Sequence, residues 1–408
     1  MNFPEYVAFT LDRLEENGYS AYLVGGCVRD FLMGIVPHDF DITTCATPEQ
    51  IENCFSDIKT LDVGKKHGTI TLVFDKECVE VTTYRIDGEY IDSRHPETVT
   101  FTDRIEDDLS RRDFTMNAIA YSPQRGFVDP FGGKSDIEKR KIVCVGNPSV
   151  RFEEDALRIM RGLRFSSRLG FEIEEETLRA MVAKKDLLCN IASERIREEF
   201  VGILNGRFVS EMIFSENSFF EILSVIIPEV NSVDFGNLHD FLMQSYEFEE
   251  IVRLCAFFCS FTPETAFEIL HRLRFDNRTI KTVTAVVSNV ESKFNVHDEV
   301  SLKKSIAELT EDVAYYLYMT LGCVYKWVNE EVSKCHINAA EKIRELVKRG
   351  ECVSIKQLDI KGNEIIDVLG INPSMTGKML ERLLCDVIEE KVNNSKDALI
   401  ARAQEYIA

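Results

Sequence analysis

The chain carries its most informative run close to the N-terminus, where LVGGCVRD occupies residues 23–30 and DFD occupies residues 39–41. The pattern is a short apolar strand that runs into two glycines and then into a helix. Glycine at such a turn lets backbone N–H groups approach a phosphate closely, and the N-terminus of the helix adds positive potential. The run therefore predicts a phosphate-binding turn, with Arg29 one helical turn away and able to reach the same phosphate.

Carboxylates follow this turn at short spacing. Asp39 and Asp41 stand two residues apart on an expected strand, so both side chains point to one side of it. Paired carboxylates hold hard cations such as Mg²⁺, which take their remaining ligands from substrate phosphates. Glu80 interrupts an apolar strand pattern at residues 79–83. It is a third candidate, either as a metal ligand or as the acceptor of a proton from an attacking hydroxyl.

Two arginine-rich runs come next. The first, RRDFTMNA at residues 111–118, places two arginines at the start of an expected helix, where guanidinium groups can bind triphosphate oxygens bidentately. The second, EEDALRIMRGLRFSSR at residues 153–168, predicts one continuous helix. Its spacing groups these charged residues near one face: Asp155, Arg158, Arg161 and Arg168, with Arg164 at the edge. Surface salt bridges are the simpler interpretation, but they do not explain why arginines that repel one another share a face.

Composition limits the possible classes of protein. The 408 residues are 45% hydrophobic and 29% charged, which is typical of a globular protein and excludes disordered and fibrous classes. The net charge of −21 excludes a uniformly basic surface for nucleic acid. Residues 101–200 nevertheless carry 18 basic and 19 acidic side chains, against 8 and 18 in residues 1–100. We therefore expect an anionic ligand to meet the arginine-rich segment.

The cysteine pattern and the apolar segments of the sequence predict the cellular location. The twelve cysteines are scattered, without a Cys-x-x-Cys pair or a histidine cluster, so zinc is not expected. No apolar run approaches the roughly 18 residues of a membrane helix, and the N-terminus lacks a signal-peptide pattern. We expect a cytoplasmic protein with reduced thiols and no membrane partner.

The organisation changes along the chain. Strand and helix patterns alternate at first, residues 85–100 predict a long loop, and helical periodicity dominates from residue 151 onward. The expected class is α+β, with a small N-terminal head built on a mixed β-sheet and an extended all-α remainder. The predicted domains are a catalytic head at residues 1–145, a helical neck at 146–210, a helical body at 211–340 and a helical tail at 341–408.

Together these motifs resemble those of the bacterial class II tRNA nucleotidyltransferases, the CCA-adding enzymes, which belong to the polymerase-β-type nucleotidyltransferase superfamily. The resemblance extends nearly end to end. It covers a metal motif at residues 25–41, a ribose and triphosphate motif at 111–118, a hinge motif at 129–137, a nucleobase-template motif at 154–158 and a helix-stabilising motif at 192–195. A C-terminal signature around residues 362–371 implies contact with the tRNA elbow.

The resemblance implies specific roles for these residues. Asp39 and Asp41 would bind Mg²⁺. Gly26, Arg29 and Arg112 would contact the phosphates and ribose of the nucleotide. Asp155 and Arg158 would read the base, and Arg161 and Arg164 would support the nucleotide. The implied activity is addition of C, C and A to the 3′ end of tRNA from CTP and ATP without a nucleic-acid template, by a monomer or homodimer.

Base reading by Asp155 and Arg158 has its own chemical rationale. A carboxylate only accepts hydrogen bonds and a guanidinium only donates them. Cytosine and adenine both offer an exocyclic N–H donor beside a ring-nitrogen acceptor, whereas uracil and guanine present the reverse. A wrong base therefore leaves buried polar groups unpaired, at about 1–3 kcal/mol each. This logic can supply discrimination on the order of 10⁴ without editing.

Several other functions stay open. The long loop at residues 84–101 favours full CCA addition over a CC-adding enzyme, although His95 departs from the Arg-Arg-Pro usual there. A-adding enzymes share the loop. Bacterial poly(A) polymerases carry a basic Arg-Arg-Phe element where this chain has GKKHGT at residues 64–69. A small-molecule nucleotidyltransferase would explain the paired aspartates but not the long helical remainder. A non-catalytic RNA-binding protein is the most distant alternative.

Overall fold

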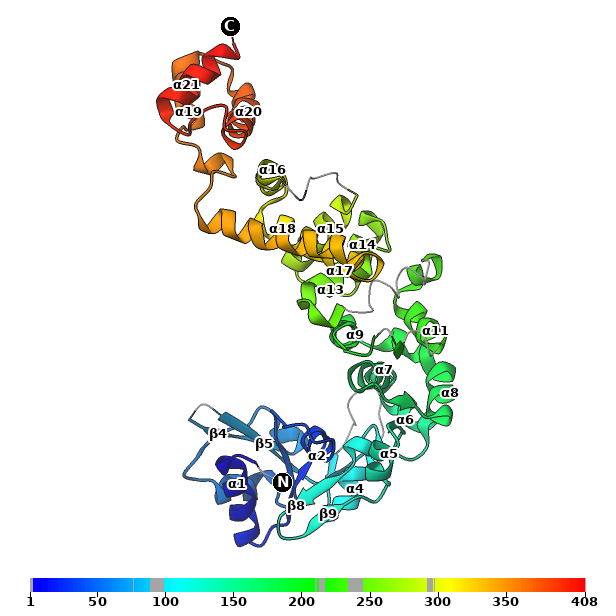
Figure 1. The fold of residues 1–408 in the computed structure, drawn as a ribbon. Helices are drawn as coiled ribbons and strands as arrows, with labels where there is room; N and C mark the ends of the chain where they lie inside the picture. The colour runs from blue at the N-terminus through cyan, green and yellow to red at the C-terminus, as the bar shows by residue number, and fades with distance from the viewer. Residues whose placement is uncertain are drawn as a thin grey trace. The chain divides into compact units, whose positions relative to one another are not determined.

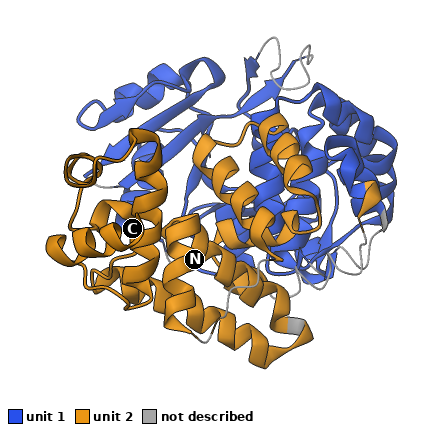
Figure 2. Cartoon of the chain, turned by 90° about the horizontal axis from the view of Figure 1, so that it is seen from above, with its two compact units in different colours: residues 1–230 blue, residues 231–408 orange. Residues whose placement is uncertain are grey.

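A computed structural model describes residues 3–75, 77–88, 99–209, 211–212, 217–233, 245–291, 296 and 298–407 of the protein. The chain forms two compact units, residues 1–230 and 231–408, which Figure 2 shows in blue and orange. The first unit contains a mixed sheet, and the second is helical, so the expected α+β class is confirmed. The finer division into head, neck, body and tail stays a prediction.

The first unit is built on a seven-stranded sheet with the order β3-β4-β5-β2-β1-β8-β9. Its strands are β1 (Ala21–Val24), β2 (Asp41–Thr44), β3 (Lys59–Leu61), β4 (Thr69–Phe74), β5 (Glu77–Thr83), β8 (Ala120–Ser122) and β9 (Gly126–Val128). β2 and β5 run parallel, and the other neighbours in this sheet are antiparallel. β1 is buried along its whole length, as its apolar sequence requires of a central strand. Two short strand pairs lie apart from this sheet: β6 (Arg85–Asp87) with β7 (Val99–Phe101), and β10 (Lys141–Ile142) with β11 (Glu172–Ile173).

Helices accompany the sheet and continue beyond it (Figure 1). They are α1 (Glu5–Glu16), α2 (Gly26–Leu32), α3 (Pro48–Cys54), α4 (Ile105–Ser110), α5 (Gly133–Glu138), α6 (Pro148–Glu154), α7 (Leu157–Leu169), α8 (Glu175–Lys184), α9 (Ser193–Leu204) and α11 (Asn217–Ile226), with 3₁₀ turns η1 (Lys65–His67), η2 (Thr115–Asn117), η3 (Lys185–Asn190) and η4 (Pro228–Ser232). Ile105 and Leu109 of α4 share one buried cluster with Val24 of β1 and Ala120 of β8. This packing fixes the position of the arginines that follow α4.

Local sequence explains where several of these helices begin and end. Thr47 and Gln50 form a capping box at the start of α3. The Thr47 side chain accepts from the Gln50 backbone N–H, and the Gln50 side chain accepts from the Thr47 backbone N–H. The Asn147 side chain accepts hydrogen bonds from two backbone N–H groups at the start of α6. Gly170 closes α7 with a φ of 65°, a left-handed conformation in which glycine has no steric penalty, as the sequence predicts.

Three of the expected elements are wrong or incomplete. The continuous helix expected at residues 153–168 is interrupted at Asp155, whose backbone is extended and whose side chain accepts from the Leu157 N–H at 3.0 Å. The arginines at 111–112 follow the C-terminus of α4 rather than start a helix, because η2 and β8 occupy the next residues. The loop expected at 85–100 is bounded by the paired strands β6 and β7. Its central residues, 89–98 with His95 among them, lie outside the described part of the chain.

The second unit is helical throughout its described residues. Its helices are α13 (Glu250–Phe258), α14 (Pro263–Arg272), α15 (Asn277–Asn289), α16 (Glu299–Leu309), α17 (Glu311–Val328), α18 (Glu330–Lys348), α19 (Gly362–Leu369), α20 (Thr376–Ile388) and α21 (Lys396–Glu405), with 3₁₀ turns η5 (Ser245–Glu247), η6 (Ile355–Gln357) and η7 (Pro373–Met375). A separate apolar cluster joins α19, α20 and α21. Within the described residues, none of the helices combines the length and apolar character needed to span a bilayer.

Candidate active site

The turn between β1 and α2 is the meeting point of the candidate site. Gly25 has a φ of 78°, which a residue with a side chain rarely adopts. A Cβ at Gly25 would lie 3.2 Å from Nη1 of Arg112 and 4.0 Å from Oδ2 of Asp41. Glycine therefore brings the backbone close to a cation and a carboxylate that come from distant parts of the sequence.

Three carboxylates stand at the exposed side of the sheet beside this turn. Asp39 and Asp41 are both exposed while Phe40 between them is 8% exposed, so the alternation expected for the pair holds, although β2 itself begins only at Asp41. The register of the parallel strands places Asp41 beside Glu80, which is also exposed. The structure therefore brings together all three acidic residues selected from the sequence.

The electrostatics of Asp41 fit a cation. Although Asp41 as a residue is exposed, the protein around its carboxyl group displaces solvent and raises its pKa. Arg112 opposes this effect, and the negative charges of Glu80 and Asp39 reinforce it. Among the described residues, no set of three or more histidine, cysteine or carboxylate side chains lies close enough together to hold a metal ion by itself. An incomplete set of oxygen ligands suits Mg²⁺, which keeps waters and binds through one or two carboxylates plus substrate phosphates.

Arg112 reaches the turn from the end of α4. Its Nη2 donates to Oδ2 of Asp108 at 3.3 Å, while Arg111 donates to Oδ1 of the same carboxylate through Nε at 2.9 Å and Nη2 at 2.8 Å. Nε of Arg112 is buried and has no hydrogen-bond partner among the described residues. The guanidinium is therefore anchored at its Nη2 end, and its Nη1, at the Gly25 turn, is the end that can meet a ligand.

Arg29 is placed differently from Arg112. It is 4% exposed, and its Nη1 donates to Oδ1 of Asn117 at 2.8 Å, while Nε and Nη2 donate to Asp30 at 2.9 and 2.6 Å. Asn117 in turn donates to Oδ1 of Asp113 at 3.1 Å. These bonds tie α2 to the segment after Arg112, so a direct phosphate contact by Arg29 stays a prediction. Gly26, the first residue of α2, carries no side chain that could compete with a ligand at the turn.

Asp155 and Arg158 lie at the interruption between α6 and α7. Arg195 of α9 donates to Asp155 through Nη2 at 2.9 Å. Arg158 is 8% exposed; its Nη1 donates to Glu154 at 2.7 Å and its Nη2 to the carbonyl oxygen of Arg111 at 2.9 Å. The acceptor and the donor expected to read a base are therefore each held by a separate partner. The bond to Arg111 also joins α7 to the end of α4.

The next two arginines of α7 have carboxylate partners from other elements. Arg161 binds Asp113 through Nε at 2.7 Å, and Arg164 forms an ion pair with Glu199 at 2.7 Å. Burial raises the pKa of Asp113, but Arg161, Asn117 and the Phe114 N–H more than offset this and lower it to about 2. Carboxylates from several elements thus offset the repulsion between the arginines of α7, which the sequence pattern left unexplained.

The sequence motifs omitted two carboxylates of this arrangement, Glu199, which pairs with Arg164, and the buried Asp108. Of these, Asp108 left a signal in the sequence. It precedes Arg111 and Arg112 by three and four residues, which is the spacing of ion pairs along a helix. That signal was available in the sequence, but it applies only once residues 105–110 are recognised as a helix.

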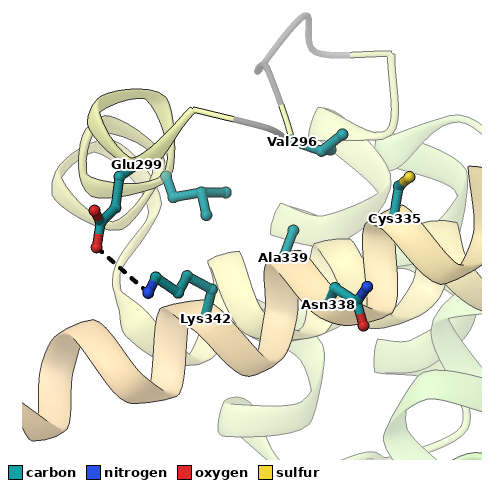
Figure 3. A pocket seen from close by; sticks show the side chains of 7 residues that line it. Val296, Glu299, Cys335, Asn338, Ala339 and Lys342 are labelled. Carbon is teal, nitrogen blue, oxygen red and sulfur yellow. Dashed lines mark ion pairs between the residues drawn. The ribbon is translucent and has the colours of Figure 1, made fainter.

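A hollow in the second unit offers different chemistry. It has a volume of about 360 Å³ and lies between α16 and α18, with Cys335 and Asn338 at its wall (Figure 3). Its charged residues, Glu299 and Lys342, pair with each other at 3.6 Å. Since these charges neutralise each other, this hollow lacks the excess of carboxylates or arginines that distinguishes the site in the first unit.

Comparison with known proteins places this geometry in context. The family profile described as "Poly A polymerase head domain" matches residues 21–143. A second, "Probable RNA and SrmB- binding site of polymerase A", matches residues 170–232, and a third, "tRNA nucleotidyltransferase domain 2 putative", matches residues 247–403.

Individual proteins are similar over part or nearly all of the chain. The CCA-adding enzyme of Bacillus cytotoxicus is 33% identical over 396 residues, covering 95% of each chain. That of Geobacillus kaustophilus is 49% identical over 201 residues, covering 49% of each chain. The crystal structure of the Bacillus stearothermophilus CCA-adding enzyme in complex with CTP superimposes with a TM-score of 0.79 at 26% identity, covering 100% of this chain and 98% of that one.

Proposed function

The chain belongs to the family of CCA-adding tRNA nucleotidyltransferases, and from this membership we propose that it adds C, C and A to the 3′ end of tRNA, using CTP and ATP and no nucleic-acid template. One observation of the site supports the proposal most strongly: Arg112, Asp41 and the Gly25 turn converge at one point. A cation, a carboxylate and a close-approaching backbone are the groups that a metal-bound nucleoside triphosphate requires.

The reaction transfers a nucleotidyl group. The terminal 3′-hydroxyl oxygen of the tRNA forms a bond to the α-phosphorus of the nucleotide, and the bond to the leaving pyrophosphate breaks. Asp39 and Asp41 would hold a divalent cation, which we take to be Mg²⁺, and that ion would supply neutralisation of phosphate charge. Glu80 either completes the ligand set or accepts the hydroxyl proton. Arg112 donates to the triphosphate or ribose, which every incoming nucleotide shares.

Base selection is assigned to Asp155 and Arg158. Each oxygen of a carboxylate has two lone pairs, so Asp155 can accept from a base N–H while it still accepts from Arg195. Glu154 and the Arg111 carbonyl hold the Arg158 guanidinium in a defined orientation. A preorganised acceptor beside a preorganised donor complements C and A and opposes U and G. Arg161 and Arg164 are assigned to support of the nucleotide, and their partners Asp113 and Glu199 hold them in place.

The tRNA is expected to meet the arginine-rich first unit through its backbone rather than through its sequence, because the enzyme must serve every tRNA. Contact of the second unit with the tRNA elbow belongs to the same proposal. Cytoplasmic location and a monomeric or dimeric state also stay predictions.

The test offers each nucleotide singly to three tRNA transcripts, which end before the CCA sequence, after the first C and after the second C. Full CCA activity adds two C residues to the first transcript with CTP alone and one A to the third with ATP alone. Addition restricted to the third transcript would indicate an A-adding enzyme, and addition that stops at CC even with ATP present would indicate a CC-adding enzyme. Long A tails would indicate a poly(A) polymerase. Binding of tRNA without any incorporation would refute the catalytic proposal.

A further inference from the structure

A fully buried carboxylate lies behind the candidate site. Asp108 is on α4, is 0% exposed and faces away from solvent beside Leu109, which packs in the cluster between α4 and β1. Carboxylates are almost never buried completely unless they are paired. Its position therefore requires partners that compensate the charge.

Asp108 has such partners on both oxygens. Oδ1 accepts from Nε and Nη2 of Arg111 at 2.9 and 2.8 Å. Oδ2 accepts from Nη2 of Arg112 at 3.3 Å. The Thr43 hydroxyl lies 3.4 Å from the same oxygen and 3.1 Å from the carbonyl oxygen of Thr82, and its one proton can go to either. Burial raises the pKa of Asp108, but the two arginines outweigh this effect and keep it below its usual value. The side chain is therefore a charged anchor that spans α4, the residues after it and β2.

The anchor acts on a residue that reaches the reaction centre. Arg112 has a long, flexible side chain, and holding this side chain in one conformation costs conformational entropy. Its Nη2 is held by Asp108, while its Nη1 lies at the Gly25 turn beside Asp41. With one end fixed, the guanidinium is oriented before a nucleotide arrives, which improves the interactions it makes in the transition state.

We propose that Asp108 is a positioning residue for nucleotidyl transfer, which holds the Arg112 guanidinium at the Gly25 turn. The inference rests on the proposed function, because Arg112 matters here through the nucleotide. Loss of the anchor should weaken all nucleotides alike, since Arg112 meets the part that they share. It should leave base selection by Asp155 and Arg158 intact.

The variant Asp108→Asn keeps the shape of the side chain and removes its charge. We expect kcat/KM for CTP and for ATP to fall by the same factor, roughly 10- to 100-fold, with the CTP to UTP ratio unchanged. Asp107→Asn is the matched control, because Asp107 is on the same helix and accepts from the Thr102 hydroxyl at 2.9 Å. The control should retain wild-type turnover.

A double-mutant cycle separates positioning from general stability. In an Arg112→Ala background, Asp108→Asn should cause no further loss, because the guanidinium that it orients is gone. An undiminished additional loss would show that Asp108 acts through another route and would overturn the inference, as would an Asp108→Asn enzyme indistinguishable from the Asp107→Asn control. If Asp108→Asn does not fold, Thr43→Val removes the hydroxyl that lies 3.4 Å from the same oxygen, together with its 3.1 Å contact to the Thr82 carbonyl, without burying a new polar group. A smaller loss that likewise vanishes without Arg112 is then expected, and a loss independent of Arg112 would overturn the inference.

Equilibrium binding keeps the test separate from the proposed function. The affinities of the full chain for CTP and for ATP are measured by calorimetry without tRNA. Both affinities should fall by the same factor in Asp108→Asn and stay unchanged in Asp107→Asn. Wild-type protein that binds both nucleotides but extends no tRNA would refute CCA addition while leaving the positioning role measurable. Unaltered nucleotide affinity in Asp108→Asn, together with unaltered turnover, would refute the positioning role alone.

Discussion

Replacing Asp155 with asparagine changes the hydrogen-bonding character of the base-reading side chain without changing its shape. In the structure Oδ2 accepts from Nη2 of Arg195 at 2.9 Å, and Oδ1 accepts from the Leu157 N–H at 3.0 Å. An amide keeps only one oxygen. Because a charged donor is the stronger partner, that oxygen is expected to stay on Arg195. The NH₂ group then takes the other position, where the bond from the Leu157 N–H is lost, and presents donors where a base N–H requires an acceptor.

The magnitude follows from the bonds that change. For CTP, the variant loses a hydrogen bond to a charged group, worth about 1.5–3 kcal/mol. For UTP, the new NH₂ group gives the base carbonyl a hydrogen-bond donor, so that a polar group unpaired in the wild type becomes paired, which is worth about 1–3 kcal/mol. At about 1.4 kcal/mol per tenfold change, the ratio of kcat/KM for CTP over UTP should fall by roughly 10²- to 10⁴-fold. The loss of ratio, rather than a loss of rate, is the specific outcome.

The assay measures single-nucleotide addition to a tRNA transcript that ends before CCA, with CTP and UTP titrated separately. Glu153→Gln is the matched control, since it makes the same chemical change at an exposed residue of α6, two positions before Asp155, and should leave the ratio unchanged. Arg112→Ala should weaken all four nucleotides alike. If Asp155→Asn keeps the wild-type ratio while it still turns over, the base is selected elsewhere and the assignment of Asp155 is wrong.

Further predictions address the metal pair, packing, pH and salt. Asp41→Asn should raise the activation free energy of nucleotide addition by several kcal/mol and so lower the rate roughly 10³-fold or more. The affinity for tRNA, measured by gel shift, should be unchanged. Near-normal turnover would exclude the metal assignment. Gly133→Ala should destabilise the protein by about 2–3 kcal/mol in denaturant unfolding, because the new Cβ would lie 2.1 Å from the Thr115 carbonyl oxygen. The Gly377→Ala control lies in α20, meets no atom within 4 Å and should not destabilise the protein, since alanine favours a helix over glycine. The pKa of Asp113 is lowered to about 2 in the folded protein, so its stabilisation, about 2 kcal/mol, is present above the unfolded value near 3.9 and is lost as pH falls toward 2. Asp113→Asn should therefore cost stability at pH 7 and much less at pH 2.5, and an equal cost at both values would contradict this. Affinity for tRNA should decrease steeply with salt concentration, and salt-independent binding would argue against backbone contacts.

The local parts of the site could be predicted from the sequence because their signals are local. A glycine turn between a strand and a helix, and two aspartates separated by one buried residue, depend on neighbours within a few positions. The structure places Gly25, Asp41 and Glu80 as those patterns suggested. The interruption at Asp155 was missed because apolar periodicity continues across it, and only the extended backbone and the bond to Leu157 reveal the break.

What the sequence by itself determined was the class of the fold, and it also supplied the residues to which we assign the chemistry. Those properties follow from residue type and short spacing, which persist in any conformation of the chain. Only the tertiary structure decided the partners that join distant segments: Asp113 for Arg161, Glu199 for Arg164 and Arg195 for Asp155. These pairs join segments that lie tens of residues apart, and an arginine pattern is equally compatible with many acidic residues. The choice is made by packing, because burial makes an unpaired charge costly and leaves only the carboxylates within reach to compensate it.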